Sequence, residues 1–297
     1  MTTTIVSAEK YHGTENDFLV LPADAPVPDR AAFAATHCDR ETGVGGERTG
    51  ADGVLFLDLD PTASPVRVTM TLVQPDGSTA EMCGNGARVT AVWAARETGA
   101  REVLIETPAG DRHAVVQSDG VTVEMGRPSF EPADVPLAPD HDGPLIEEGV
   151  EGLTVTAVNT GVPHAVAFVD DVDAVNLDTV APPVRHAAVF PEGANVTLAS
   201  RAEVGDEAEV REGAPGEPAA FRQRTFERGV EGETLACGTG AVALVAAAKR
   251  TGRLDTEGPV RVSPPGGDLV IVVPDDGPAT LTGPVEREFE VDLEVPA

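Results

Sequence analysis

Apolar positions in this chain form two helix-like stretches and a series of short strand-like runs. Residues 87–96 and 241–250 are rich in alanine and apolar around the whole circumference of a helix, which predicts two buried helices. Gly99 and Gly252 follow these stretches, where glycine commonly ends a helix. The strand-like runs are separated by turns that contain Gly or Pro, so the pattern favours antiparallel sheets wrapped around each helix.

The same order of motifs occurs twice along the chain. Residues 77–87 read Gly-Ser-Thr-Ala-Glu-Met-Cys-Gly-Asn-Gly-Ala, and residues 232–241 read Gly-Glu-Thr-Leu-Ala-Cys-Gly-Thr-Gly-Ala. Each motif precedes a helix-like stretch, a Thr-Gly pair and strand-like runs, at residues 102–106, 114–116 and 121–126 in one copy and 260–262, 269–273 and 279–283 in the other.

We therefore predict a duplicated α/β (α+β) fold, in which each half is a sheet or barrel around a central helix. The first domain is expected to comprise residues 1–125 plus 284–297, and the second residues 126–283. Residues 206–218 are polar and rich in Glu, Gly and Pro, and we interpret them as a surface loop.

The charge of the chain limits its partners. Fifty acidic residues face 21 basic ones, the formal net charge is -29, and Lys10 and Lys249 are the only lysines. Nucleic acid is not expected as a partner, because phosphate contacts need clustered Lys and Arg. The composition is that of an ordinary acidic protein or of a haloarchaeal-like, halophilic one, and scarce Lys and few aromatic residues favour the second.

Neither a signal peptide nor a membrane span is expected. Residues 1–10 lack a basic segment followed by an apolar stretch, and charged residues, Gly or Pro interrupt every apolar run. We expect a cytoplasmic protein with no membrane partner.

Cofactor chemistry fits the residue inventory poorly. The three cysteines, Cys38, Cys83 and Cys237, include no Cys-x-x-Cys pair, and the six histidines show no metal-ligand spacing. Pyridoxal phosphate needs a Schiff-base lysine, and Lys249 ends one of the buried helix-like stretches. We therefore expect neither a metal nor a cofactor.

Cys83 and Cys237 each stand before a glycine pair that opens a helix-like stretch. A helix N-terminus carries partial positive charge and free N–H groups, which favour a thiolate and can bind a carboxylate. A lone cysteine in this context is most often structural, but two copies at matching places could face each other across a pseudo-twofold axis. Epimerisation needs such a pair, one group to remove a proton and another to add one. Cys38 has no counterpart, and we interpret it as structural.

Five segments together resemble the diaminopimelate epimerase family over nearly the whole chain. They are residues 12–18 (His-Gly-Thr-Glu-Asn-Asp-Phe), 76–88 around Met-Cys-Gly-Asn-Gly-Ala-Arg, 161–164 (Gly-Val-Pro-His), Asn195, and 227–241 around Glu-Arg-Gly and Ala-Cys-Gly-Thr-Gly-Ala. The resemblance implies cofactor-independent interconversion of LL- and meso-2,6-diaminoheptanedioate in lysine biosynthesis, with a small amino-acid substrate. A homodimer remains open.

The resemblance also implies roles for individual residues. Cys83 and Cys237 would carry protons, and His164 and Glu227 would tune the thiols. The substrate would be held by Asn16, Gln74, Gly84, Asn85, Asn195, Glu227, Arg228, Gly238 and Thr239. Simpler structural roles remain open: a surface ion pair for Arg228, a satisfied buried side chain for His164 and a turn position for Asn16. Asp76 is interpreted as a turn former.

The chain departs from the family pattern in three places. Gln74 and Val162 stand where many members have Asn, and residues 46–50 form a small insertion before Ala51. These departures bear on recognition of the distal amino-acid centre. Two alternatives stay open, a proline or hydroxyproline racemase with two cysteines and a non-catalytic relative of the same fold. The Glu227–Arg228 pair and Asn195 favour a substrate with a second amino-acid group.

Overall fold

The computed structural model of the 297-residue chain describes residues 4–118, 120–202 and 219–296. The chain divides into two compact units, Met1–Glu124 with Thr282–Ala297 and Met125–Leu281. Residues 206–218, which the sequence predicts to be a surface loop, lie outside the described residues. In the described part of the chain, no helix is long and apolar enough to cross a membrane.

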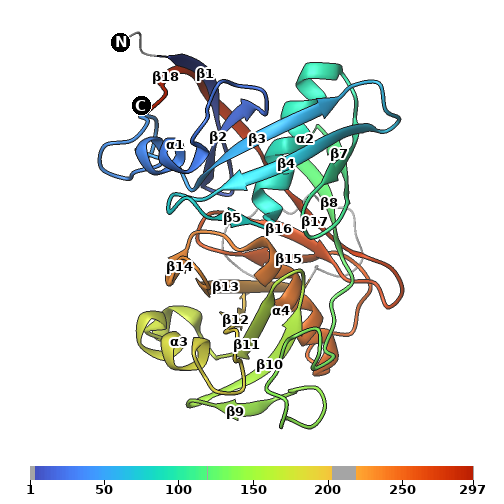
Figure 1. Cartoon of the computed structure of the whole chain (residues 1–297). Helices are drawn as coiled ribbons and strands as arrows, with labels where there is room; N and C mark the ends of the chain where they lie inside the picture. Colours follow the sequence, from blue (N-terminus) through green and yellow to red (C-terminus); the bar gives the residue numbers. More distant parts are fainter. Residues whose placement is uncertain (1–3, 119, 203–218, 297) are drawn as a thin grey trace. The chain divides into compact units, whose positions relative to one another are not determined.

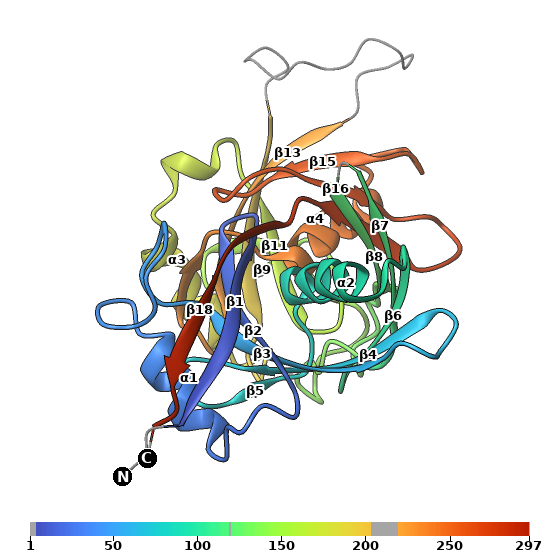
Figure 2. The same cartoon turned by 90° about the horizontal axis from the view of Figure 1, so that it is seen from above.

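The first unit surrounds helix α2, Gly84–Thr98, with strands. Its elements are β1 (Ile5–Gly13), β2 (Asn16–Pro22), α1 (Arg30–His37), β3 (Gly53–Asp60), β4 (Val66–Val73), β5 (Thr79–Ala80), β6 (Glu102–Glu106), β7 (Arg112–Gln117), β8 (Gly120–Gly126) and β18 (Glu286–Glu294). Figure 2 looks nearly along α2 and shows β1, β3, β4, β6 and β7 around it, and α2 packs against all five. Ten α2 residues, from Gly84 to Ala94, are buried, as the apolar pattern predicts.

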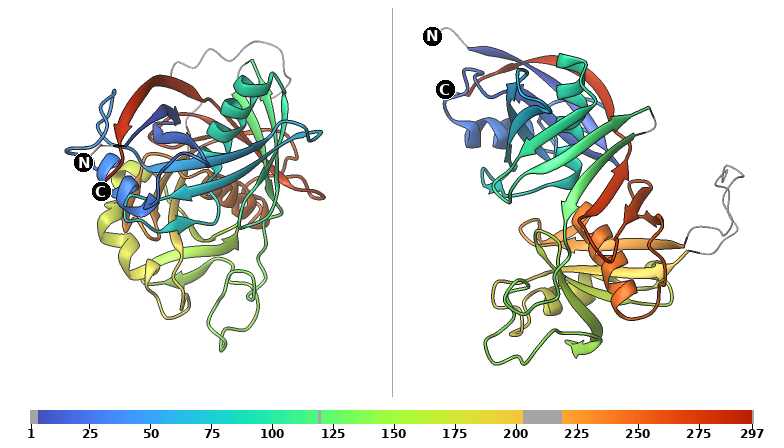
Figure 3. Two further views of the ribbon diagram at one scale, coloured as in Figure 1. Left: turned by 45° about the horizontal axis from the view of Figure 1, so that its top comes forward. Right: turned by 90° about the vertical axis from the view of Figure 1, so that its right-hand side faces the viewer.

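Both ends of the described chain belong to this unit. Strands β1 and β18 pair antiparallel from Ile5 with Glu294 to His12 with Glu286. The Val295 N–H donates to the Thr4 carbonyl at 2.8 Å, which brings the two ends together (Figure 3). The first unit is therefore closed by the last strand of the chain.

The second unit repeats this plan around helix α4, Gly238–Arg250. Its elements are β9 (Glu148–Val150), β10 (Leu153–Asn159), β11 (Pro163–Phe168), η1 (Val172–Ala174), α3 (Leu177–Arg185), β12 (Asn195–Arg201), β13 (Ala220–Glu227), β14 (Gly232–Thr234), β15 (Val260–Ser263), β16 (Leu269–Val272) and β17 (Ala279–Gly283). Figure 1 shows α3 beside β12 and β13, and α4 packs against β10, β11, β12 and β16. The α4 residues from Gly238 to Ala248 are all buried.

Strand pairing shows the duplication directly. In the first unit β2 pairs parallel with β3, β3 antiparallel with β4, and β4 parallel with β6. In the second unit β11 pairs parallel with β12, β12 antiparallel with β13, and β13 parallel with β15. The prediction of antiparallel sheets is therefore wrong at these pairs. A helix lies between the two strands of each parallel pair in the chain, and such a crossover returns the chain in the same direction.

The helix boundaries follow from capping. Cys83 and Cys237 are extended N-cap residues, so both helices begin at the following glycine, three residues earlier than the apolar pattern indicates. Gly99 ends α2 in the left-handed conformation with φ 78°, as predicted. In the second unit the cap is Thr251, and the left-handed Gly252 comes one residue later.

Candidate active site

The first thiol lies at the N-terminus of α2. Cys83 is partly buried, and its Sγ accepts a hydrogen bond from the Gly86 N–H at 3.4 Å. This contact places the sulfur among the free N–H groups of the first helical turn, where the helix dipole favours negative charge. The geometry is that of a thiol beside an anion cradle, as the motif predicts.

Two asparagines from distant segments meet beside this cradle. The Asn85 amide nitrogen donates to the Asn16 amide oxygen, and the Asn16 amide nitrogen donates to Asp52 at 2.9 Å. Asp52 also accepts from the Asp17 N–H at 3.1 Å and from Arg40 at 2.5 Å. The amide orientation of Asn16 is therefore fixed from both sides.

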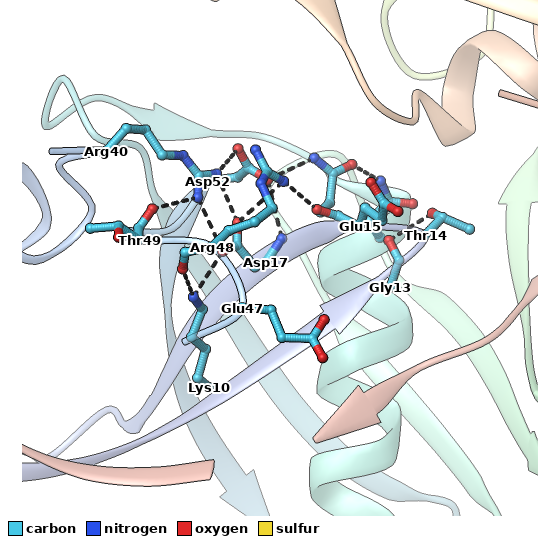
Figure 4. Close-up of polar contacts among 12 residues, drawn as sticks. Lys10, Gly13, Thr14, Glu15, Asp17, Arg40, Glu47, Arg48, Thr49 and Asp52 are labelled. Carbon is cyan, nitrogen blue, oxygen red and sulfur yellow. Dashed lines mark hydrogen bonds and ion pairs between the residues drawn. The ribbon is translucent and has the colours of Figure 1, made fainter. Parts of the chain in front are cut away.

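An ionic cluster built on the buried Lys10 and Asp17 holds Asp52 in place (Figure 4). Arg40 donates to both oxygens of Asp17, at 2.7 and 3.1 Å, and the fully buried Lys10 lies 3.0 Å from the same carboxylate. Burial raises the pKa of Asp17, but Arg40 and Lys10 outweigh it and hold the pKa below its usual value. The lowered pKa keeps Asp17 ionised at neutral pH, and its contacts with Arg40 and Lys10 therefore persist there.

Residues 46–50, which the resemblance indicates are a small insertion, contact this cluster. Lys10 donates to the Arg48 carbonyl at 2.5 Å, and Arg48 donates to the Glu15 carbonyl at 2.6 Å. Arg40 donates to the Thr49 carbonyl at 3.1 Å. The insertion thus fastens the turn between β1 and β2, which leads directly into Asn16 (Figure 4).

That turn is conformationally strained. Thr14 and Glu15 have φ of 51° and 60°, and β-branched residues rarely adopt the left-handed region. The fully buried Arg88 donates to Thr14 Oγ1 at 3.0 Å and so helps to hold the turn. Burial lowers the pKa of Arg88 to about 10, while negative charge on Cys83 acts in the opposite direction.

The second thiol caps α4 in the other unit. Cys237 is buried, and its Sγ lies 3.4 Å from Thr239 Oγ1. The helix start packs closely against the strands behind it. A Cβ at Gly240 would lie 2.7 Å from Gln223 Nε2 and 3.1 Å from the hydroxyls of Thr197 and Thr225, so only glycine fits there without displacement.

His164 is joined to the second thiol through Thr239. Its Nε2 lies 3.0 Å from Thr239 Oγ1, and its Nδ1 lies 3.2 Å from Thr197 Oγ1. The imidazole is fully buried, and burial, assisted by Arg228, lowers its pKa to about 3. His164 is therefore neutral at physiological pH.

The expectation that the helix N-terminus lowers the thiol pKa is wrong for Cys237. Burial raises its pKa well above the usual value, and the negative charge of Glu227 raises it further. The cost of placing a charge in a dry site next to a carboxylate outweighs the helix dipole here. Burial and Glu227 therefore both favour the thiol form of Cys237.

The remaining predicted residues of the second unit gather around Asn195. Its Oδ1 accepts from the Arg228 N–H at 2.7 Å, and its Nδ2 lies 3.3 Å from His164 Nε2. The Arg228 side chain is half-buried and donates to the Glu192 carbonyl at 3.4 Å, and it forms no ion pair in the described part of the chain. Glu227 accepts a hydrogen bond from Thr234. Asn195, His164, Glu227, Arg228, Gly238 and Thr239 thus share one neighbourhood with Cys237.

Four other positions are less central. Gln74 lies after the end of β4 and donates to Ser78 Oγ at 2.9 Å, within its own turn. Asp76 accepts from the Ser78 N–H in the same turn, which confirms it as a turn former. Val162 lies half-buried in the turn between β10 and β11. Cys38 is buried away from any helix start, and burial raises its pKa to about 12.

Residues that hold these sites were absent from the sequence-based prediction. They are Lys10, Arg40, Asp52 and Arg88 in the first unit and Thr197, Gln223 and Thr225 in the second. Two of them carried a signal in the sequence: Lys10, because lysine is so scarce in this chain, and Arg88, which ends the family-like segment 76–88. Among the described residues, no group of His, Cys, Asp and Glu side chains is arranged to hold a metal.

Comparison with known proteins places this geometry in context. A family model described as diaminopimelate epimerase matches residues 8–131 and 156–288. A protein of Methanocella arvoryzae named diaminopimelate epimerase is 40% identical over 98% of this chain and 98% of its own length. Proteins of the same name from Methanothrix thermoacetophila and Archaeoglobus fulgidus are 38% and 36% identical, over 94% and 96% of this chain and 90% and 95% of their own lengths.

Solved structures share the fold. A Bacillus anthracis phenazine biosynthesis protein of the PhzF family has a TM-score of 0.67 at 15% identity, covering 98% of this chain and 99% of that one. A hydroxyproline epimerase from Agrobacterium vitis, with bound trans-4-hydroxy-L-proline, has a TM-score of 0.57 at 17% identity, covering 99% and 92%. At such identities the likeness concerns the fold alone, and it confirms the predicted duplicated α/β architecture.

Proposed function

The chain belongs to the diaminopimelate epimerase family, and from this premise we propose that it interconverts LL- and meso-2,6-diaminoheptanedioate with Cys83 and Cys237 as the two proton carriers. The observation that carries the proposal is the duplicated N-cap cysteine, present in both units at the start of a buried, glycine-opened helix. A racemase or epimerase of an amino acid needs two such groups, because the proton leaves one face of the α-carbon and returns to the other.

The helix N-termini at Gly84 and Gly238 supply hydrogen-bond donors as well as the thiols. When the α-proton leaves, negative charge develops on the substrate carboxylate, and preorganised N–H donors stabilise that charge without reorganisation. Gly84 and Gly238 allow the substrate carboxylate to approach the helix N-termini closely. Because these donors stabilise the charge electrostatically, we propose that the reaction proceeds without a cofactor.

Substrate recognition is divided among the other predicted residues. Asn16 and Asn85 present amides beside Cys83, and Asn195, Glu227 and Arg228 present an amide, an anion and a cation near Cys237. A neighbouring anion and cation suit the second amino-acid group of the substrate. The Arg228 guanidinium would bind its carboxylate, and Glu227 would bind its ammonium group. This pairing favours diaminopimelate over proline, and Gln74 would contribute through its own amide.

His164 and Glu227 would set the protonation of Cys237. Glu227 raises the pKa of that thiol, and His164 reaches it through Thr239. We further propose that the protein works in the cytoplasm of a cell with high internal salt, in lysine biosynthesis. The net charge of -29 supports this proposal, because molar salt screens such repulsion.

The test is epimerisation of LL-diaminopimelate by the purified protein in molar salt, with a chelator present and no cofactor added. The wild-type protein and Cys38→Ser are expected to be active. Cys83→Ser and Cys237→Ser are each expected to lose at least about a thousandfold in kcat, since each removes one of two proton carriers. Activity that depends on pyridoxal phosphate or a metal, or that survives either substitution, would exclude the proposal.

α-Proton exchange in deuterated buffer then distinguishes the two thiols. Cys83→Ala and Cys237→Ala are each expected to exchange the α-proton of one epimer without inverting it, and the two variants should prefer opposite epimers. NMR of each epimer with each variant measures this. Exchange of the same epimer by both variants would contradict the assignment of one thiol to each face.

A further inference from the structure

Hydrogen bonds around Cys237 form a closed circuit of buried groups within the second unit. The Cys237 Sγ lies 3.4 Å from Thr239 Oγ1, which lies 3.0 Å from His164 Nε2. On the other side of the imidazole, His164 Nδ1 lies 3.2 Å from Thr197 Oγ1, which lies 3.2 Å from Thr225 Oγ1. Gln223 Nε2 closes it, since this atom donates to Thr225 Oγ1 at 3.0 Å and to the Cys237 carbonyl at 3.1 Å. Each hydroxyl and the neutral imidazole can donate only one hydrogen, so the direction of one hydrogen bond fixes the direction of the next.

Asn195 indicates which atom is the acceptor at His164 Nε2. The Arg228 N–H can only donate, so the Asn195 atom that it meets at 2.7 Å is the amide oxygen. The amide nitrogen of Asn195 therefore faces His164 Nε2, at 3.3 Å. An amide NH₂ has no acceptor lone pair to offer, so a hydrogen on Nε2 would face another donor. An accepting Nε2 avoids this clash, with its single lone pair facing both the Asn195 amide and the closer Thr239 hydroxyl.

The other directions follow by counting hydrogens. A neutral imidazole whose Nε2 accepts carries its hydrogen on Nδ1, so Nδ1 donates to Thr197 Oγ1. Thr239 then donates its only hydrogen to Nε2. Thr239 Oγ1 can then hydrogen-bond the Cys237 sulfur, at 3.4 Å, only as an acceptor, which favours a hydrogen on the sulfur.

We propose that Thr197 is a positioning residue, which together with Asn195 holds His164 in the Nδ1–H tautomer and thereby keeps Cys237 as a thiol before substrate binds. This inference rests on the proposed role of Cys237 as a proton carrier. Thr197 touches neither the sulfur nor the main chain of Cys237; it acts through the imidazole. Its side chain is fully buried, so no water replaces its hydroxyl.

Few charged groups compete with this arrangement. Glu227, His164 and Arg228 are the titratable groups that face the circuit. Strands β10 and β16, which also pack against α4, contain no titratable residue. Strand β12 contains only Arg201, which donates to the Arg253 carbonyl. Glu227 acts in the same direction as the circuit, since its negative charge disfavours a thiolate.

The tautomer can be observed directly. In protein labelled with ¹⁵N-histidine, the two ring nitrogens of His164 are distinguished by NMR, and loss of their signals in His164→Gln assigns them. The expected result is a neutral ring protonated on Nδ1 from pH 6 to pH 8. A ring protonated on Nε2, or an imidazolium in this range, would overturn the inference.

The second measurement is the pH profile of Cys237 alkylation by iodoacetamide in a Cys83→Ser background. Thr197→Val removes the hydroxyl at nearly constant volume and leaves Nδ1–H without an acceptor, so the hydrogen is expected to move to Nε2. Nε2–H then donates to Thr239, whose own hydrogen turns to the sulfur and stabilises a thiolate. The midpoint is expected to fall by about one pH unit, a tenfold faster reaction at any pH below both midpoints.

Two variants control this result. Thr197→Ser keeps the hydroxyl and is expected to restore the wild-type profile. Thr156→Val removes another buried hydroxyl of the same unit, one that accepts from the Glu147 N–H outside the circuit, and should leave the profile unchanged. An unchanged midpoint in Thr197→Val, or an equal shift in Thr156→Val, would overturn the inference. Neither readout requires turnover, so failure of the proposed function would appear separately, as epimerisation by Cys237→Ser.

Discussion

Asp17 and His164 occupy equivalent positions in the two halves of the repeat. Asp17 pairs with His12 across the first hairpin, and His164 pairs with Val158 across its counterpart. The parallel neighbour of His164 is Asn195, and the Asp17 N–H bonds to Asp52 on the equivalent strand connection. Equivalent strand positions therefore carry an ionic cluster in the first unit and a buried neutral imidazole in the second.

This difference predicts unequal thiol reactivity. Cys83 is partly exposed and accepts a helix N–H, whereas burial raises the pKa of both Cys237 and Cys38. Iodoacetamide at pH 8 should therefore modify Cys83 at least about tenfold faster than either of the others. Peptide mapping over time measures the three rates, and Cys38 as the fastest site would contradict the argument.

Glycine substitutions should separate the two helix starts. Gly240→Ala places a methyl 2.7 Å from Gln223 Nε2, and we expect a loss of about 2 kcal/mol of stability together with most activity. Gly86→Ala serves as the matched control, because its nearest neighbour is the flexible Leu55 Cδ2 at 3.3 Å, and its cost should stay below about 1 kcal/mol. Chemical denaturation and kcat/KM measure both, and equal costs would refute the packing argument.

Asp52 should matter through Asn16. Asp52→Ala removes the acceptor that orients the Asn16 amide, so kcat/KM is expected to fall at least about tenfold, the equivalent of one hydrogen bond to a charged group. Asp60→Ala removes an exposed carboxylate that bonds only locally to Thr62 and should have no effect on kcat/KM. Steady-state kinetics decide between these outcomes.

His164 should make stability depend on pH. The pKa of His164 is about 3 in the folded state and 6.5 in the unfolded state. Between these pH values only the unfolded state binds the proton, which destabilises the fold. The contribution is present above pH 6.5 and is lost as the pH falls toward 3, at about 2 kcal/mol between pH 6.5 and pH 5. The free energy of unfolding of His164→Gln should lack this dependence on pH, whereas that of His186→Gln, which changes an exposed histidine, should keep it. Urea unfolding at a series of pH values measures both.

Salt should stabilise the protein. With a net charge of -29, repulsion between exposed carboxylates is least screened in dilute buffer. The thermal midpoint is expected to rise steeply from low to molar salt. A midpoint that stays flat or falls across the series would favour an ordinary acidic protein over a salt-adapted one.

Local patterns in the sequence were sufficient for the repeat, the two buried helices and their cysteine caps. Capping, glycine stops and apolar runs depend on neighbouring residues, so β6 and β17 begin and end where the pattern predicts. The resemblance also pointed to His164, Glu227, Arg228, Gly238 and Thr239, which lie in short continuous motifs and gather around Cys237. Each of these features depends on a few neighbouring residues, so the sequence predicts it without knowledge of the tertiary structure.

Tertiary structure alone decided the rest. The β2–β3 and β4–β6 pairs are parallel because helical crossovers carry the chain back, which no single strand pattern records. Gln223 donates to the Cys237 carbonyl and Thr197 contacts His164, and neither residue belongs to a motif that the sequence analysis recognised. The sign of the Cys237 pKa shift depends on burial and on Glu227, and the cost of burying a charge is a property of the assembled site, not of the sequence.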